Sequence, residues 1–192
     1  MSSTISLKGE TALVIGGTRN IGLSIATALQ KAGAAVCIVG GSDHAALEAA
    51  LKKLSHSDGQ AIGLISDTSD EEAVSKAFEA CEEAFGPVSV IVNGPGFRPH
   101  ANLTDINLET WNAVMAVMLT GPFLTCRELF RRLPPERKGA VVNLGGLSAH
   151  RPAKGRAHVI AAKAGIIGLT RALAAEGAGR IRANCVVPGL ID

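Results

Sequence analysis

The sequence alternates short apolar runs with longer stretches in which apolar residues recur at helical spacing. The runs with the length of buried strands are 11–16, 35–40, 61–66, 88–92, 140–144 and 181–187. The stretches with helical spacing are 20–32, 45–54, 69–85, 108–133 and 159–176. Near-continuous apolar strands joined by helices form parallel sheets covered by helices on both faces. We therefore predict an α/β fold, a doubly wound parallel sheet in three layers, as one domain over residues 1–192.

Local signals fix some element ends. Either Ser42 or Asp43 is expected to cap the helix over 45–54, because both side chains accept hydrogen bonds from a helix start. The helix over 108–133 contains Pro122, preceded by glycine. Proline removes a backbone donor, so we expect this helix to bend there.

Composition excludes several functions. A net charge of +2 gives no argument for binding nucleic acid or a membrane surface. No apolar run reaches the roughly 18 residues of a membrane span, and the N-terminus has no signal-peptide core. The cysteines, at positions 37, 81, 126 and 185, lack C-x-x-C spacing, so we predict neither a metal site nor a disulfide framework. Free thiols fit a cytoplasmic protein.

A glycine-rich turn joins the first predicted strand to its helix and reads Gly16-Gly17-Thr18-Arg19-Asn20-Ile21-Gly22. Glycines here let the backbone approach a pyrophosphate, and the helix start offers free N–H groups and a positive dipole end. The pattern is not G-x-G-x-x-G, and a tight connection between strand and helix explains it equally simply. Its place at the start of an alternating chain favours a dinucleotide site.

Six motifs, in order along nearly the whole chain, resemble those of the short-chain dehydrogenase/reductase family, especially its bacterial β-ketoacyl carrier-protein reductases. They are the turn 16–22, Asp67-Thr68, Asn93-Gly94-Pro95-Gly96, Leu119-Thr120-Gly121, Lys163-Ala164-Gly165 and Pro188-Gly189. The turn departs from the family's T-G-x-x-x-G-I-G at the leading threonine, where this chain has Ile15, and at the middle glycine, where it has Asn20. The resemblance implies a Rossmann-type sheet, a nicotinamide cofactor and a homodimer or homotetramer.

The resemblance also assigns cofactor contacts. They are Gly16, Thr18, Arg19, Asn20, Ile21, Gly22, Ser42, Asp67, Thr68, Asn93, Gly94, Gly96, Lys163, Pro188, Gly189 and Ile191. NAD-selective proteins place a carboxylate at the end of the second strand, where this chain has Gly40. Arg19 resembles the 2′-phosphate ligands of NADPH-dependent members, and a guanidinium suits a phosphate by charge and shape. We expect NADP(H) rather than NAD(H), with Ser42 as a second contact.

The family's catalytic Asn, Ser, Tyr and Lys are reduced here to the lysine. The matching positions hold Met118, Gly146, Val159 and Lys163, and the chain contains no tyrosine at all. A phenol therefore cannot donate the proton that ketone reduction requires. The resemblance gives Lys163 a bond to the nicotinamide ribose, and its charge can stabilise a developing oxyanion.

Other side chains are candidates for the missing donor. We rank His158 first, then Ser148 and then His150, because each lies near a lost position and histidine can donate near neutral pH. For each of them, a solvated or backbone-bonded loop residue is the simpler interpretation.

Two functions remain open. We expect an NADP(H)-dependent oxidoreductase that reduces a carbonyl or an activated alkene of a small-molecule or acyl-thioester substrate. The alternative is a catalytically silent relative that binds cofactor or scaffolds a partner. In the family, a further strand and a helical lid follow the sixth strand, so we also expect the domain to be incomplete at its C-terminus.

Overall fold

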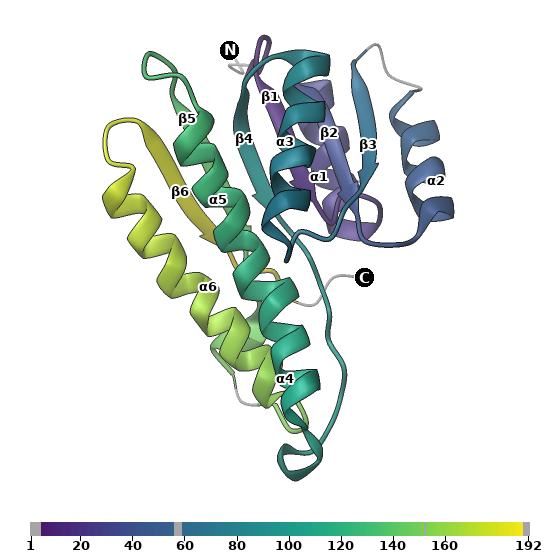
Figure 1. Cartoon of the computed structure of the whole chain (residues 1–192), viewed down its shortest axis with the longest axis vertical. Coiled ribbons are helices and arrows are strands. Elements are labelled where there is room, and N and C mark those ends of the chain that lie inside the picture. Colours follow the sequence, from purple (N-terminus) through teal and green to yellow (C-terminus); the bar gives the residue numbers. More distant parts are fainter. Residues whose placement is uncertain (1–4, 56–58, 152, 190–192) are drawn as a thin grey trace.

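The structure is a computed structural model and describes residues 5–55, 59–151 and 153–189. Its strands are β1 (Thr11–Ile15), β2 (Ala35–Gly40), β3 (Ala61–Ile65), β4 (Val88–Asn93), β5 (Gly139–Leu144) and β6 (Ile181–Val186). They form one parallel sheet in the order β3-β2-β1-β4-β5-β6 (Figure 1). The predicted doubly wound, Rossmann-type sheet is confirmed, and each strand lies within two residues of its expected bounds.

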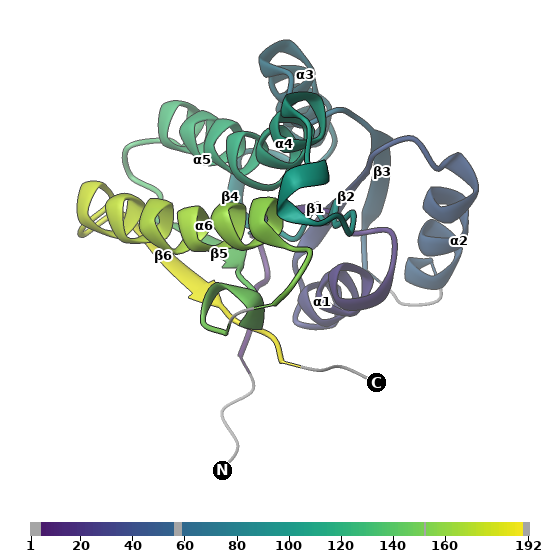
Figure 2. The ribbon, with the colours of Figure 1, turned by 90° about the horizontal axis from the view of Figure 1, so that it is seen from below.

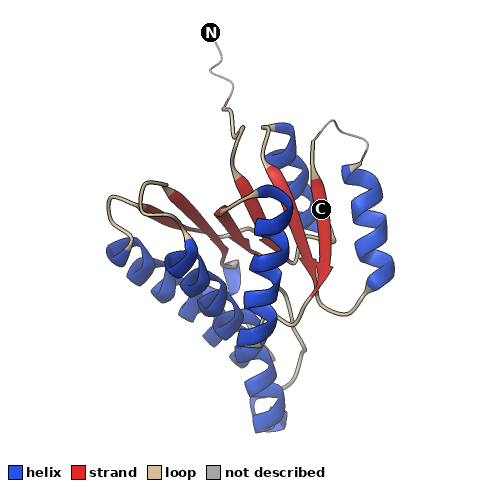
Figure 3. Ribbon diagram, turned by 45° about the horizontal axis from the view of Figure 1, so that its top comes forward, coloured by secondary structure: helices blue, strands red, loops and turns tan. Residues whose placement is uncertain are grey.

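Helices cover both faces of the sheet, as Figures 2 and 3 show. They are α1 (Asn20–Lys31), α2 (His44–Leu54), α3 (Glu71–Phe85), α4 (Leu108–Met115), α5 (Gly121–Arg132) and α6 (Ala157–Glu176). One core cluster joins α1 and α2 to the sheet, and the other joins α3, α5 and α6 to the opposite face. The two clusters lie on opposite faces of the sheet because side chains alternate along a strand, and successive residues of β1 accordingly belong to opposite clusters.

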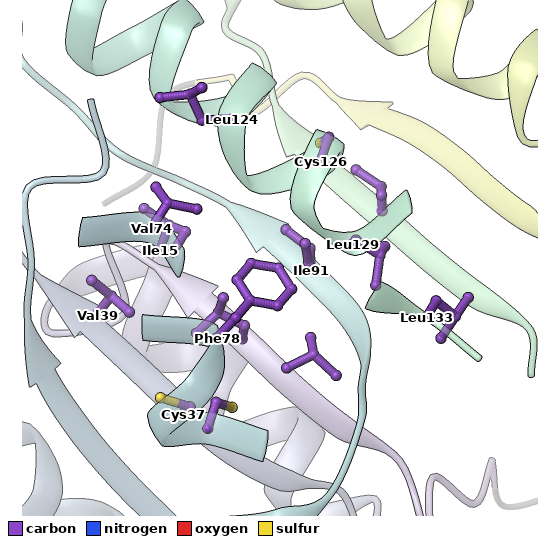
Figure 4. Close-up of a cluster of buried hydrophobic side chains, with 14 of the residues drawn as sticks. Ile15, Cys37, Val39, Val74, Phe78, Ile91, Leu124, Cys126, Leu129 and Leu133 are labelled. Atoms are coloured by element: carbon purple, nitrogen blue, oxygen red, sulfur yellow. The ribbon is translucent and has the colours of Figure 1, made fainter. Parts of the chain in front are cut away.

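The cluster under α3 and α5 contains the largest fully buried side chain among the described residues, Phe78. Phe78 of α3 is fully buried and lies among Ile91 of β4 and Leu129 of α5 in Figure 4. Burying a side chain of this size contributes about 1.5–3 kcal/mol. This packing holds β1 and β4 firmly, and the candidate site lies at the carboxyl ends of those strands.

The helix predicted over 108–133 changes its hydrogen-bond pattern just before Pro122, where a bend was expected. A π-helical segment, Ala116–Thr120, separates α4 from α5, and the N–H of Gly121 donates to the carbonyl of Ala116, five residues back. The irregularity begins before Pro122 because proline has no N–H for the carbonyl of Met118, four residues earlier. The π segment thus contains Met118, the position that matches the family's catalytic asparagine.

Two helical stretches, Leu108–Arg132 and Ala157–Glu176, have the length and hydropathy of membrane-spanning helices. Both contribute residues to the core clusters and pack beside the sheet (Figure 2). Core helices of α/β folds have the same composition, so these properties alone do not place either stretch in a membrane.

Candidate cofactor site and active site

The loops that follow β1 and β4 meet where the strand order reverses. The N–H of Gly94 donates to the carbonyl of Ile15 over 3.0 Å. Gly16 has a φ of +74°, and a Cβ added there would lie 2.7 Å from the carbonyl oxygen of Gly94. Only glycine fits this approach. Open α/β sheets bind ligands beyond the carboxyl ends of their strands at such a switch point.

The start of α1 is open to an anion. Arg19 occupies the N-cap without a side-chain cap bond, and the first turn of α1 holds no acidic residue. The first N–H groups of a helix have no partner inside it, and the helix dipole is positive there. A Cβ on Gly22 would overlap the carbonyl oxygen of Gly16, so the turn keeps its shape only with glycine at this position. The geometry fits a pyrophosphate.

A hollow of about 430 Å³ lies between α1 and α2, lined in part by Thr18, Arg19 and Asp43. At its edge, the guanidinium of Arg19 pairs with the carboxylate of Asp43, and both side chains are exposed. Asp43 also caps α2 by accepting from the N–H of Ala46 at 2.8 Å. That bond chiefly, with the charge of Arg19, lowers the pKa of Asp43. The cap was predicted; the ion pair was not.

No carboxylate fits at the end of β2. A Cβ on Gly40 would lie 2.9 Å from the Cγ2 of Thr18, so the turn after β1 packs directly on this strand end. Ser42 is exposed in the following turn. The acidic residue nearest in sequence to this strand end is Asp43, and Arg19 already holds it.

The loop after β3 carries Asp67 and Thr68, two of the predicted cofactor contacts. The Asp67 carboxylate accepts from the hydroxyl and the N–H of Ser69, at 2.7 and 2.9 Å, and these bonds lower its pKa. Asp67 also lines a second hollow, of about 280 Å³. Thr68 is buried, and a Cβ on Gly121 would lie 3.0 Å from its carbonyl oxygen. Asp67 therefore faces a hollow, whereas Thr68 packs against the start of α5.

Below the site, a chain of hydrogen-bonded, buried polar side chains runs from α5 through β4 and β5 to α6. Thr125 donates to Asn93 over 2.8 Å, Asn93 donates to Asn143 over 2.9 Å, and Asn143 donates to Thr170 over 2.9 Å. The two asparagines are register partners in β4 and β5. Because the Asn93 amide is fully engaged, only its backbone is free to face a cofactor. We had not predicted Asn143, although an asparagine in the apolar run of β5 was a visible signal.

Lys163 lies at the carboxyl end of β5. Its Nζ donates to the carbonyl of Leu144 at 2.5 Å, and the side chain is only 9% exposed. Burial, assisted by the nearby charge of Arg98, lowers the pKa of Lys163 to about 8. An amine with this pKa is mostly protonated at neutral pH and remains a usable acid.

The position of the lost serine adjoins this lysine. A Cβ on Gly146 would lie 3.7 Å from the Cγ and Cδ of Lys163 and 3.6 Å from the Oγ of Ser148. The structure thus brings the predicted pair, Lys163 and Ser148, to one place. His150, the third-ranked donor, is exposed in the turn that follows.

The positions of the lost asparagine and tyrosine have become apolar core. Met118 and Val159 pack in one cluster with Val114 and Ala162, and both are at least 97% buried. No polar atom of either side chain is present to relay a proton. This part of the family's catalytic arrangement is replaced by a dry contact between α6 and the π segment.

The simpler interpretation of His158, as a solvated or backbone-bonded loop residue, was wrong. It is neither solvated nor backbone-bonded: its exposure is 0%, and neither ring nitrogen has a hydrogen-bond partner among the described residues. Helix geometry places His158 about 140° around the axis of α6 from Lys163, and on the same side of that helix as Gly165. A Cβ on Gly165 would lie 2.8 Å from Leu119, so that side of α6 faces the π segment.

The end of the described chain completes the site. The N–H of Gly145 donates to the carbonyl of Val186 over 2.8 Å, and Pro188 and Gly189 follow β6 beyond this bond. Ile191 lies outside the described residues. Within those residues, no group of three or more His, Cys, Asp or Glu side chains is placed to hold a metal ion.

Comparison with known proteins agrees with this geometry. The model of a family described as short chain dehydrogenase matches residues 10–192. The 3-oxoacyl-[acyl-carrier-protein] reductase FabG of Chlamydia trachomatis is 35% identical over 188 residues, which are 97% of this chain and 75% of that protein.

Two further relatives show the range of the similarity. The inactive 2-(S)-hydroxypropyl-CoM dehydrogenase 2 of Xanthobacter autotrophicus is 34% identical over 168 residues, covering 87% of this chain and 71% of that protein. The crystal structure of a dehydrogenase/reductase from Sinorhizobium meliloti superposes with a TM-score of 0.93 at 34% identity, covering 98% of this chain and 75% of that one.

Proposed function

The chain belongs to the short-chain dehydrogenase family, and we propose that it is an NADP(H)-dependent oxidoreductase that reduces a carbonyl or an activated alkene. The observation that carries this proposal is Lys163, a buried amine with a pKa of about 8 beside the position of the lost serine. Perturbed pKa values at the carboxyl edge of such a sheet are typical of catalytic groups. In our proposal, Lys163 replaces the tyrosine as proton donor.

The residues present fit a nicotinamide dinucleotide. The close approach of Gly16 to Gly94 and the uncapped start of α1 suit a pyrophosphate, and Asp67 lines a hollow beside the end of β3. Arg19 is the group that would take a 2′-phosphate, and this favours NADP(H) over NAD(H). It would do so by leaving or sharing Asp43, its present partner.

The chain's own residues supply the proton. When bound, the nicotinamide supplies a hydride to the carbonyl carbon, and the electron pair of the C=O bond moves to the oxygen. Lys163 donates a proton from Nζ to that oxygen, which breaks an N–H bond, forms an O–H bond and leaves a neutral amine. Its Nζ bond to the Leu144 carbonyl orients the ammonium beforehand. We propose that Ser148 donates a hydrogen bond to the same oxygen and holds it near Lys163.

A second candidate is a catalytically silent relative that binds cofactor or scaffolds a partner. It is favoured by the apolar contact between Met118 and Val159, where the family has polar groups. A relative whose own name describes it as inactive shows that the family includes such proteins. Under this alternative, NADPH binds without turnover and Lys163 serves packing alone.

Turnover separates the two. We would follow NADPH absorbance with a panel of ketones, enones and 3-oxoacyl thioesters, comparing the native chain with Lys163→Met and, as a matched control, the exposed Lys138→Met. Oxidation that Lys163→Met abolishes and Lys138→Met retains supports the enzyme. Binding of NADPH without oxidation across the panel supports the silent relative.

We further propose a single dinucleotide-binding domain that acts in the cytoplasm as a homodimer or homotetramer on a small-molecule or acyl-thioester substrate. The chain spans about three quarters of the length of the relatives it matches. Leu108 of α4 and Phe123 of α5 are exposed apolar side chains, and they support a subunit contact along this long helical stretch.

A further inference from the structure

Positive charge is concentrated in the two loops at the active-site edge of the sheet. Between Glu83 and Asp105, and again between Glu136 and Glu176, the sequence contains no acidic residue. Within these segments, the two loops carry Arg98, Arg151, Lys154 and Arg156, and Lys163 follows in α6. The net charge of the whole chain is only +2, so this excess is local.

The loop after β4 and the turn before α6 are fastened together. The N–H of Ala101 donates to the carbonyl of Gly155 over 3.1 Å, and Nη1 of Arg156 donates to the carbonyl of Arg98 over 2.7 Å. The ring of His100 lies directly over Gly155, where a Cβ would overlap it. Figure 1 shows the loop after β4 running toward the start of α6. These contacts hold the two arginines on neighbouring backbone segments.

Neither arginine has a carboxylate partner in the part of the chain that the structure describes. Ion pairs are formed by five of the other arginines, Arg19, Arg127, Arg131, Arg132 and Arg137, and by none of the remaining four among the described residues. None of these pairs includes Arg98, Arg156 or Lys163. The ammonium of Lys163 and the guanidinium of Arg98 also repel each other, which contributes to the low pKa of the lysine.

The start of α6 adds to this field. Arg156 is its N-cap residue without a side-chain cap bond, and the first turn contains no acidic residue. The positive end of the helix dipole therefore faces the same region as the arginines. A neutral substrate would leave all this charge uncompensated, whereas an anionic group would neutralise it.

We propose that Arg98 and Arg156, with the start of α6, form a subsite for an anionic group carried by the substrate. The substrate is then a small molecule that bears a carboxylate, sulfonate or phosphate as well as the carbonyl reduced beside Lys163. Guanidinium groups bind such anions through two parallel N–H bonds, which fixes orientation as well as charge. The reduction rests on the proposed function above, but the binding of the anion does not.

Calorimetric titration tests the subsite without requiring turnover. The 192-residue chain, with and without NADPH, is titrated with acetoacetate, 2-oxopropanesulfonate and dihydroxyacetone phosphate. Methyl acetoacetate, the uncharged ester of acetoacetate, serves as the neutral control. We expect at least one anion to bind about tenfold or more tightly than the ester, as a charge-assisted bidentate contact gives. The three anions also identify which anionic group the subsite prefers.

Variants locate the binding. Arg98→Gln and Arg156→Gln should each weaken binding of the preferred anion about tenfold and leave that of the ester unchanged. Arg156→Lys keeps the positive charge but loses the two parallel N–H donors of the guanidinium, so its affinity for the anion should lie between those of the native chain and Arg156→Gln. Arg171→Gln, an exposed position on the same helix, is the matched control and should bind like the native chain. Melting curves check that each variant is folded.

The outcomes separate the two proposals. Equal binding of anions and ester, no binding of any anion at millimolar concentration, or arginine variants that bind like the native chain would overturn the subsite. Anion binding that depends on the arginines, with no NADPH oxidation, would keep the subsite and refute the proposed reductase. Oxidation with equal efficiency on methyl acetoacetate and acetoacetate would keep the reductase and refute the subsite.

Discussion

Replacing Lys163 by methionine should change how the stability of the protein depends on pH. Burial holds the pKa of Lys163 near 8 in the folded protein, compared with 10.5 in an unperturbed lysine. The unfolded chain therefore binds the lysine proton over a pH range in which the folded protein has released it. By linkage, the free energy of unfolding rises with pH between about 8 and 10.5, by about 3 kcal/mol in all.

Below pH 8 the full cost of the buried charge is present. In this range Lys163→Met removes the ammonium but also leaves the Leu144 carbonyl without its donor, which costs about 1–3 kcal/mol. The variant should thus be about as stable as the native protein, or more stable by up to about 2 kcal/mol. Above pH 10.5 the native protein should be the more stable of the two.

Urea unfolding of both proteins at a series of pH values measures this difference directly. Other groups titrate alike in the two proteins and cancel in the comparison. The native protein should gain about 3 kcal/mol on the variant between pH 8 and 10.5. A difference that stays constant with pH would refute the depressed pKa and, with it, the reason for assigning Lys163 as an acid.

Three further predictions, with five variants between them, test separate parts of the site. Arg19→Ala should weaken NADPH binding about tenfold or more and leave NADH binding nearly unchanged. Asp43→Asn keeps the α2 cap but releases Arg19, so it should tighten NADPH binding. If Arg19→Ala weakened the binding of both cofactors equally, the assignment of Arg19 would be contradicted. Gly16→Ala should abolish cofactor binding measured by calorimetry, while Gly168→Ala, which meets no atom within 4 Å, should raise helix stability by about 1 kcal/mol. His158→Leu should raise the free energy of unfolding by about 1–2 kcal/mol and retain NADPH oxidation. Loss of oxidation in a folded His158→Leu protein would make the histidine the donor.

The sequence predicted the elements and their order because apolar periodicity records which face of each element is buried. The strands and the α2 cap at Asp43 are local signals, and both were confirmed, whereas the bend expected at Pro122 is represented by a π-helical segment just before it. The parallel direction of the strands followed from the rule that strands joined by helices run parallel, and the Rossmann-type arrangement followed from the family resemblance.

Side-chain pairing across the fold was not accessible in the same way. Arg19 and Asp43 are 24 residues apart and meet only because α1 and α2 pack on the same face of the sheet. The bond between Asn93 and Asn143 depends on the register of β4 with β5. His158 adjoins a catalytic position in sequence, yet helix geometry turns it away from Lys163.

The losses at Met118 and Val159 acquire a physical meaning in three dimensions. In sequence they are two unrelated substitutions, 41 positions apart, whereas in the fold both enter one cluster. The change is therefore a coherent repacking between α6 and the π segment, and it leaves the lysine end of the site intact. The retention of Lys163 beside Ser148 is the reason that we favour chemistry over a silent fold.

The pH dependence of NADPH oxidation tests this account most directly. For the native chain, we predict that kcat/KM with the best substrate of the panel is level below pH 8 and falls above it, as the Lys163 ammonium loses its proton. Lys163→Met should bind NADPH and show no turnover at any pH. Turnover by Lys163→Met that equals that of the native chain, or NADPH binding by the native chain without oxidation of any substrate, would contradict the assignment of Lys163 as the proton donor.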